Sequence, residues 1–184
     1  MQTVFSIDNG LRGYVCVLHE SKVLLSKTPV ARGGISRSVL RMTQEKAEDY
    51  RPTAMLQLVD LALELDSNAA FVIEEPPSNM RAKSGRHSIL MQWRGYGLWN
   101  AVVQLRGKML YVVHPSTWKA YFKITRSYDK DNTKSKALEL AQSLYPGCTF
   151  PTIDAADACL VATYFRNNFN VEVVPRNVRS KARK

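Results

Sequence analysis

The sequence is poor in cysteine and lacks long apolar stretches. Its three cysteines, Cys16, Cys148 and Cys159, lie far apart in the sequence, are odd in number and form no CxxC pair. That pattern argues against a disulfide framework and against a zinc site, and it predicts reduced, mostly buried thiols. Because no run of about 18 apolar residues occurs, we expect no membrane-spanning helix. Residues 1–8 lack the basic start and the apolar core of a signal peptide, so we expect a cytoplasmic protein.

Acidic residues are in the minority among the charged ones. The chain has 26 lysines and arginines against 16 aspartates and glutamates, which gives a formal net charge of +10 over 184 residues. A surface with this excess attracts polyanions, and nucleic acid is the partner class that we expect. Ribosome association would also explain the charge. An anionic membrane surface fits less well, because no basic amphipathic helix stands out.

The hydrophobic pattern predicts one α/β domain over residues 1–170, followed by a basic tail over residues 171–184. The predicted strands cover residues 2–8, 14–18, 23–26, 69–73 and 109–113, and the predicted helices cover 53–65, 87–105, 116–122, 153–167 and a segment that ends near 145–147. Residues 28–51 form a polar, basic excursion without a regular pattern. The short connections between the first three strands predict an antiparallel meander. The alternation of helix and strand that follows extends it to a mixed five-stranded sheet with helices on both faces, which is the layout of the RNase H-like fold.

Four carboxylates stand at the ends of these elements, among mostly apolar neighbours. Asp8 ends the first predicted strand and Glu74 ends the fourth, while Asp154 and Asp157 lie near the start of the last helix. Each one alone has a structural explanation. Asp8 fits the start of the turn that follows it, and Glu74 fits a surface charge at a strand end. Asp154 fits a helix cap, with Asp157 favoured by the helix dipole.

Taken together, the four acids predict a catalytic metal site. The first and fourth strands of such a sheet can be central neighbours, and the last helix can pack across their ends. The carboxylates would then converge, with no lysine or arginine adjacent in sequence to neutralise them. Hard oxygen ligands suit Mg²⁺ or Mn²⁺, and two such ions about 4 Å apart can act on one phosphodiester. We therefore expect a nuclease with about two Mg²⁺ or Mn²⁺ ions per site and no small-molecule cofactor.

Three motifs resemble those of the RuvC-like Holliday junction resolvases, within the RNase H-like nuclease superfamily. Ser6-Ile7-Asp8-Asn9-Gly10 resembles the first motif, and Val72-Ile73-Glu74-Glu75-Pro76 resembles the second. Asp154-Ala155-Ala156-Asp157-Ala158 resembles the third motif and is the most specific of them. The stretches 93–99 and 129–146 resemble the phage and plant-chloroplast branch of the family. The resemblance covers residues 2–167.

This resemblance implies a homodimer that nicks two strands of a four-way DNA junction symmetrically. The metal ligands that it implies are Asp8, Glu74, Asp154 and Asp157. It also implies that Lys134 lies near the scissile phosphate. The bacterial family carries an aromatic wedge shortly after the second motif, and the apolar candidate in this chain is Met80.

Basic residues beside these motifs are candidates for DNA contact. The candidates are Lys83, Arg86 and Arg94, which follow the second motif, and Lys134 and Lys136, which lie in the charged segment after residue 126. A solvated basic surface would explain the same residues. Gly95 and Gly97 interrupt the predicted helix 87–105 and cost it stability, so we expect close packing there, at a dimer seam or beside DNA.

Other functions remain compatible with the sequence. An RNase H-like nuclease could act on flaps, other branched DNA or RNA–DNA hybrids. A catalytically silent protein could bind junctions without cutting them. A kinase-like ATPase is disfavoured, because that fold needs a second lobe with its own glycine-rich phosphate loop, which the sequence lacks. The resemblance implies a structure-selective endonuclease that leaves a 5′-phosphate and a 3′-hydroxyl, and the four acids are consistent with it.

Overall fold

The computed structural model describes residues 2–32, 48–78, 85–124 and 130–169. Its strands are β1 (Val4–Ile7), β2 (Tyr14–His19), β3 (Lys22–Lys27), β4 (Val30–Arg32), β5 (Glu48–Tyr50), β6 (Ala70–Glu74) and β7 (Leu110–Val113). Its helices are α1 (Pro52–Leu65), α2 (Gly85–Gln104), α3 (Pro115–Tyr121), α4 (Lys130–Leu144) and α5 (Ile153–Asn168). No helix in these ranges has the length and apolar character needed to cross a membrane. The predicted basic tail, residues 171–184, lies outside the described residues.

The predicted mixed five-stranded sheet is confirmed, with the strand order β3-β2-β1-β6-β7. β1 lies at the centre, antiparallel to β2 and parallel to β6. β3 extends the antiparallel side, and β7 extends the parallel side. The first three strands therefore form the predicted meander, and the later strands join it through helical crossovers. This order makes the first and fourth predicted strands central neighbours.

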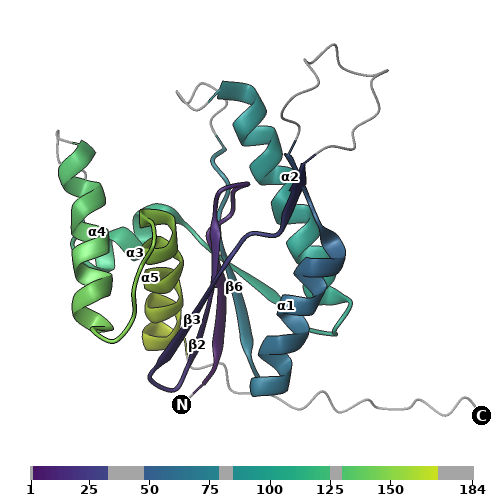
Figure 1. Cartoon of the computed structure of the whole chain (residues 1–184), viewed down its shortest axis with the longest axis horizontal. Helices are drawn as coiled ribbons and strands as arrows, with labels where there is room; N and C mark the ends of the chain where they lie inside the picture. The colour runs from purple at the N-terminus through teal and green to yellow at the C-terminus, as the bar shows by residue number, and fades with distance from the viewer. Residues whose placement is uncertain (1, 33–47, 79–84, 125–129, 170–184) are drawn as a thin grey trace, which may run out of the picture.

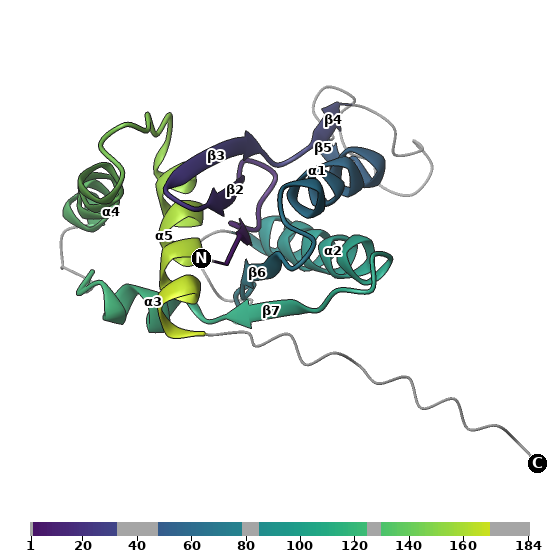
Figure 2. The ribbon, with the colours of Figure 1, turned by 90° about the horizontal axis from the view of Figure 1, so that it is seen from below.

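Helices cover both faces of the sheet, as predicted. α1 and α2 lie together on one face, and α5 lies on the other (Figure 1). α4 packs against the side of α5 that faces away from the sheet, as Figure 2 shows from below. A helix enclosed in this way is apolar all round. That position explains why the two aspartates of α5 have small and apolar neighbours, most of which are buried.

The alternation of side chains along β1 and β6 divides the core in two. Val4 and Val72 belong to the cluster under α5, whereas Phe5, Ile7 and Ile73 belong to the cluster under α1 and α2. Successive residues of a strand point to opposite faces. The residues that follow Ile7 and Ile73 therefore turn toward α5.

Residues 28–51 hold more regular structure than predicted. β4 and β5 form a two-stranded antiparallel sheet in which Val30 pairs with Tyr50. Strands of three residues are too short for an alternating pattern to show in the sequence. The intervening residues 33–47 lie outside the described residues.

Two of the cysteines are close in space, although they are far apart in the sequence. Cys16 of β2 and Cys159 of α5 are fully buried, because these two elements pack against each other. The hydrogen bond with Cys159 and then burial raise the pKa of Cys16 well above its usual range. All three cysteines are free thiols, as predicted, and Cys148 is only partly buried.

Candidate active site

Two of the predicted acids stand at the ends of neighbouring strands. Asp8 follows the last residue of β1, and Glu74 is the last residue of β6. The parallel register pairs Ile7 with Ile73, so Asp8 and Glu74 come next on the two strands. Glu74 also lies opposite Val113 of β7, whose side chain belongs to the core under α5. Both carboxylates therefore lie at one edge of the sheet, on the face that α5 covers.

The other two acids come from the first turns of α5. Thr152 is the N-cap of this helix, and its side chain accepts a hydrogen bond from a backbone N–H of the first turn at 3.2 Å. The interpretation of Asp154 as the cap is therefore wrong, and Asp154 lies inside the first turn. Asp157 follows three residues later on the same side of the helix. The Ser6 hydroxyl donates to the Ala158 carbonyl at 2.6 Å and fixes this part of α5 against β1.

Asp8 is the electrostatic centre of this group. Its pKa is raised well above the usual range, first by burial and then by the charges of Glu74, Asp154 and Asp157. Lys119 acts in the opposite direction and lowers the pKa of Asp8. Among the described residues, the Asp8 carboxylate accepts no hydrogen bond from the turn that follows it, so its interpretation as a turn starter gains no support. The fold thus brings the other three predicted acids within electrostatic reach of Asp8.

Trp118 holds the carboxylate of Glu74. The indole Nε1 of Trp118 donates a hydrogen bond to Glu74 Oε2 at 2.8 Å, from a ring that is fully buried. Burial raises the pKa of Glu74, whereas Lys119, this hydrogen bond and His114 lower it. Glu74 is therefore a partly buried and bonded side chain, and its interpretation as a simple surface charge does not hold.

Helix α3 supplies a cation that the sequence did not reveal. The side chain of His114 caps this helix by accepting a hydrogen bond from a backbone N–H at 3.2 Å. Lys119 lies one turn later, and its Nζ is 4.8 Å from the centre of the Trp118 ring. This cation–π contact keeps the ammonium group near Asp8 and Glu74, whose pKa values it lowers. Only the fold could show this arrangement, because α3 is distant from both acids in the sequence.

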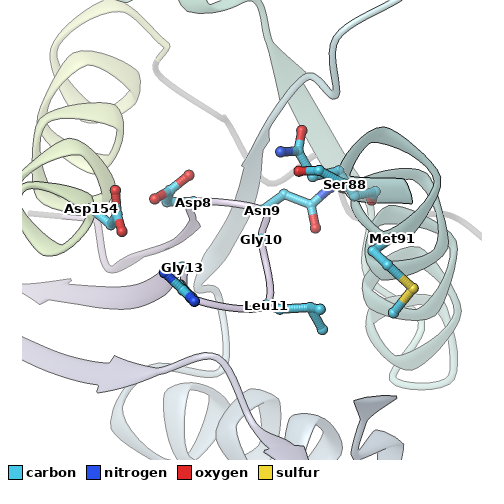
Figure 3. Close-up of a pocket in the computed structure, with 10 residues that line it drawn as sticks. Asp8, Asn9, Gly10, Leu11, Gly13, Ser88, Met91 and Asp154 are labelled. Atoms are coloured by element: carbon cyan, nitrogen blue, oxygen red, sulfur yellow. Dashed lines mark hydrogen bonds between the residues drawn. The ribbon is translucent and has the colours of Figure 1, made fainter. Parts of the chain in front are cut away.

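A hollow of about 440 Å³ opens beside Asp8. Figure 3 shows Asp8 and Asp154 on one side of it, and Ser88 and Met91 of α2 on the other. The turn between β1 and β2, residues 9–13, lies between these two sides. The acidic group is therefore accessible from the side of α2.

Asn9 and Gly95 fix how closely α2 approaches the acidic group. Asn9 Nδ2 donates to the Gln92 carbonyl at 2.7 Å, and the Tyr50 hydroxyl donates to the Met91 carbonyl at 3.0 Å. A Cβ added at Gly95 would lie 2.6 Å from Asn9 Oδ1 and would overlap the phenol of Tyr50. The predicted close packing is therefore confirmed for Gly95, but its place differs from the predicted dimer seam or DNA contact, because Gly95 packs within the chain, between α2, β5 and the end of β1.

The donor set of the four acids suits a hard divalent cation. Carboxylate oxygens are the ligands that Mg²⁺ and Mn²⁺ prefer. A cation would also relieve the repulsion that raises the pKa of Asp8. In the ranges that the structure describes, no three His, Cys, Asp or Glu side chains are already arranged to hold an ion. The suitability of the four acids for a divalent cation therefore rests on their donor chemistry and charge, and the binding of Mg²⁺ or Mn²⁺ stays a prediction.

The predicted DNA-contact residues are described only in part. Those that lie outside the described residues, wholly or in their side chains, are Met80, Lys83, Arg86 and Lys134. Arg94 Nη2 pairs with Asp49 Oδ2 at 2.7 Å and links α2 to β5. Lys136 is exposed on α4. Contact of these residues with DNA stays a prediction.

Solved structures of other proteins share this architecture. No family model and no curated protein matches the sequence. Thermus thermophilus RuvC in complex with a Holliday junction substrate matches with a TM-score of 0.57 and 14% sequence identity, over 91% of this chain and 96% of that one. A second structure of Thermus thermophilus RuvC gives a TM-score of 0.52 at 14% identity, over 90% of this chain and 96% of that one. The chain has a RuvC-like fold.

The RuvC-like fold confirms the predicted RNase H-like architecture. A yeast mitochondrial Holliday junction resolvase also matches, with a TM-score of 0.46 and 14% identity over 88% of this chain and 76% of that one. At such identities the likeness concerns the fold and not the roles of individual residues. Membership of the phage and plant-chloroplast branch is not confirmed and stays a prediction.

Proposed function

We propose that this protein is a metal-dependent DNA endonuclease that resolves four-way junctions by paired, symmetric nicks. The observation that carries the proposal is the placement of Asp8 beside three other carboxylates, at the ends of β1 and β6 and in the first turns of α5, with burial and their charges raising its pKa. Acids that repel one another in a partly buried group reduce stability, so their collection at one end of the sheet favours a functional role. The open hollow beside Asp8 gives a substrate access to them.

The fold and the charge of the chain support the same proposal. The structure of Thermus thermophilus RuvC with a Holliday junction substrate has this architecture. The chain has a formal net charge of +10, although it gathers acids around Asp8. In a nuclease the basic residues would hold the phosphodiester backbone, while the acidic group would act on one phosphate.

The residues that would hold the divalent cations, about two per site, are Asp8, Glu74, Asp154 and Asp157. Bound there, Mg²⁺ or Mn²⁺ supplies charge neutralisation at the phosphate and a water of lowered pKa. The chain itself keeps the carboxylates in place. Trp118 fixes one oxygen of Glu74, and the Ser6 hydrogen bond fixes the start of α5 against β1.

Lys119 is the candidate for contact with the scissile phosphate. Its ammonium group lies over the Trp118 ring and acts on both Asp8 and Glu74. Without DNA this charge offsets part of the repulsion among the acids. With DNA bound, the same charge would face a phosphate that lies against the carboxylates. The role that the resemblance implies for Lys134 would then be shared with a residue of α3.

The homodimer is proposed from the outer face of α2. The exposed residues that recur there at intervals of three or four are Leu90, Trp93, Gly97, Ala101 and Leu105. The exposed fractions of Leu90 and Leu105 are 55% and 69%. A Cβ added at Gly97 would meet no described atom within 4 Å, so a second α2 could approach closely at this point. Such a stripe can pair with its own copy about a two-fold axis, as two symmetric nicks require.

Light scattering of the wild type and of a Leu90→Glu, Leu105→Glu double variant tests the dimer. We expect a dimer for the wild type and a folded monomer for the variant. Asp60→Asn is the control, because it changes one exposed charge on α1 and leaves every residue of the stripe in place. A monomeric wild type at micromolar concentrations would overturn the proposed assembly.

Cleavage of a panel of labelled substrates tests the nuclease. The panel holds an immobile four-way junction, a flap, a linear duplex and an RNA–DNA hybrid, each with Mg²⁺, Mn²⁺ or EDTA. We expect paired nicks in opposing strands of the junction, lost in EDTA and in Asp8→Asn, and retained in Asp60→Asn. Cleavage of the flap or the hybrid instead would keep the nuclease and reject the junction as its substrate. Tight junction binding without any nick would reject catalysis.

A further inference from the structure

β3 is the edge strand on the antiparallel side of the sheet, as Figure 2 shows. The Tyr14 carbonyl accepts from the Asp8 N–H at 2.9 Å, so Tyr14 and every second residue after it in β2 bond toward β1. The alternate residues of β2 bond toward β3, where their partners are Lys22, Leu24 and Ser26. Val23 and Leu25 therefore direct their backbone N–H and C=O groups away from the sheet.

These outer backbone groups of β3 have no hydrogen-bond partner in the part of the chain that the structure describes. The N–H of Lys27 also points outward, while its carbonyl accepts from the Ser26 hydroxyl at 3.2 Å. A row of unpaired N–H and C=O groups is a template for a further strand. β3 can therefore bind an extended segment through main-chain hydrogen bonds.

A groove of about 720 Å³ opens beside the start of β3. One wall is the hairpin 20–24, and the other is the segment 144–149, which follows α4. Arg166 of α5 joins the two walls, because its Nη1 donates to the Glu20 carbonyl at 2.6 Å and its Nη2 to the Tyr145 hydroxyl at 3.4 Å. Val23 and Cys148 line the groove and pack against the core under α5. A strand added to β3 would thus meet an apolar surface held in a fixed place.

The groove lies at the end of the sheet that is remote from the acidic group. Val4, at the start of β1, pairs with Leu18 next to the hairpin, whereas Asp8 follows the other end of β1. Figure 1 shows the β2–β3 hairpin at the level of the C-terminal end of α5, and Asp154 lies in the first turn of that helix. A partner bound at β3 would leave the acidic group open, and its binding does not depend on cleavage.

The charges along β3 favour an acidic partner. Lys22 and Lys27 are exposed at the two ends of the strand, and Arg166 lies half-buried in the groove. Glu20 is the one acid among the described residues that line the groove. A second copy of β3 would bring its own lysines to the same edge, and exposed lysines on an edge strand oppose such pairing. The same lysines attract a strand that carries carboxylates.

We propose that β3 and its groove bind an extended segment of a partner protein in which apolar and acidic residues alternate. The apolar side chains share the face of Val23 and Leu25 and enter the groove, because residues opposite one another in a sheet point to the same face. The acidic side chains lie on the other face, near Lys22. That face of β3 is open, since Leu24 is 45% exposed, so the carboxylates stay in water.

Amide hydrogen exchange of the wild type with and without a peptide tests the addition of a strand. The probe is an acetylated hexapeptide of alternating valine and glutamate. We expect the amides of Val23, Leu25 and Lys27 to exchange rapidly in the free protein and at least about tenfold more slowly with saturating peptide. The amides of Leu24 and Ser26, which bond to β2, should exchange slowly in both samples.

Fluorescence anisotropy of the labelled peptide tests the role of charge. We expect the Lys22→Glu, Lys27→Glu double variant to bind the peptide at least about fivefold more weakly than the wild type. Lys123→Glu, Lys136→Glu is the matched control, because it makes the same change of charge at exposed lysines outside the groove. Its dissociation constant should stay within about twofold of the wild type at physiological salt, where distant charges are screened.

Several results would overturn the proposal. Equal losses of affinity in the two double variants would show that net charge alone attracts the peptide. Rapid exchange of the outward amides in the complex, or no binding by the wild type, would reject the added strand. Slow exchange of these amides in the free protein would show that another segment of the chain or a second copy already occupies the edge. The exchange measurement uses the wild type, so it decides even where the Lys22→Glu, Lys27→Glu variant fails to fold.

Discussion

Replacing Trp118 by phenylalanine removes one hydrogen bond from a candidate metal ligand. The indole Nε1 donates to Glu74 Oε2 at 2.8 Å, and the ring is fully buried. A hydrogen bond to a charged group contributes about 1.5–3 kcal/mol, and the smaller ring leaves a cavity that adds to the loss. We expect Trp118→Phe to lower the free energy of unfolding by about 2–4 kcal/mol.

The matched control is Trp99→Phe. Trp99 is also fully buried, but its Nε1 has no hydrogen-bond partner among the described residues. The substitution creates a similar cavity and at the same time removes an unpartnered N–H. We therefore expect a smaller loss, about 0–2 kcal/mol in urea unfolding.

Cleavage assays distinguish a role of Trp118 in positioning Glu74 from a role in stability alone. Trp118→Phe should slow single-turnover cleavage about 10- to 100-fold, as is usual when the partner of a metal ligand is removed. Trp99→Phe should leave the rate within about threefold of the wild type. Because the hydrogen bond lowers the pKa of Glu74, its loss should also move the acid limb of the rate profile to higher pH. Equal effects of the two substitutions, or an unchanged pH profile, would refute the role of Trp118.

Three further predictions follow from the acidic group and its surroundings. Asp8→Asn should raise the melting temperature in EDTA, by about 2–4 °C for each kcal/mol of repulsion relieved. Mn²⁺ at about 100 times the wild-type dissociation constant should stabilise the wild type by about 2.7 kcal/mol and Asp8→Asn by no more than about 1.4 kcal/mol. A lower melting temperature for Asp8→Asn than for the wild type in EDTA would contradict the expected relief of repulsion. Burial raises the pKa values of Asp8 and Glu74 in the folded state, and like charges raise that of Asp8 further. The stabilising contribution of the two groups is therefore complete below about pH 4 and is lost as the pH rises through the raised values. In EDTA, the free energy of unfolding should therefore fall less steeply with rising pH for Asp8→Asn than for the wild type. Parallel curves for the two proteins would show that the raised pKa of Asp8 does not cause the fall. Gly95→Ala should destabilise the fold by about 1–3 kcal/mol, because its Cβ would overlap Tyr50 and Asn9. Gly97→Ala meets no described atom of its own chain, so in the monomeric Leu90→Glu, Leu105→Glu background it should stabilise α2 by up to about 1 kcal/mol. Equal melting temperatures for the two glycine variants in that background would contradict the packing.

Features that depend on local pattern could be predicted from the sequence. The alternation in β1 and the apolar run of β6 predict that Asp8 and Glu74 lie at strand ends, and parallel pairing of these strands makes the two acids neighbours. The spacing of Asp154 and Asp157 placed both on one side of α5. Buried strands and a buried helix leave strong signals, because their apolar residues are continuous.

Features that depend on tertiary contact could not be predicted. Trp118 and Lys119 reach the acids from α3, and no spacing in the sequence links them to Glu74. Asp154 fits a helix cap in the sequence, but Thr152 caps α5. Both residue types can cap helices, and only the backbone shows which one does. The reason for Gly95 lies in Tyr50, a residue of a strand too short to be detected.

The central claim is that four carboxylates form one site for divalent cations, and electron paramagnetic resonance of Mn²⁺ tests it directly. Bound Mn²⁺ loses its free-ion signal, so a titration counts the ions held by the protein. We expect about two ions per chain for the wild type and for Asp60→Asn, whose carboxylate pairs with Arg106 on the surface. Asp8→Asn should bind at least about tenfold more weakly. Equal binding by Asp8→Asn and the wild type, or no binding by either, would contradict the account.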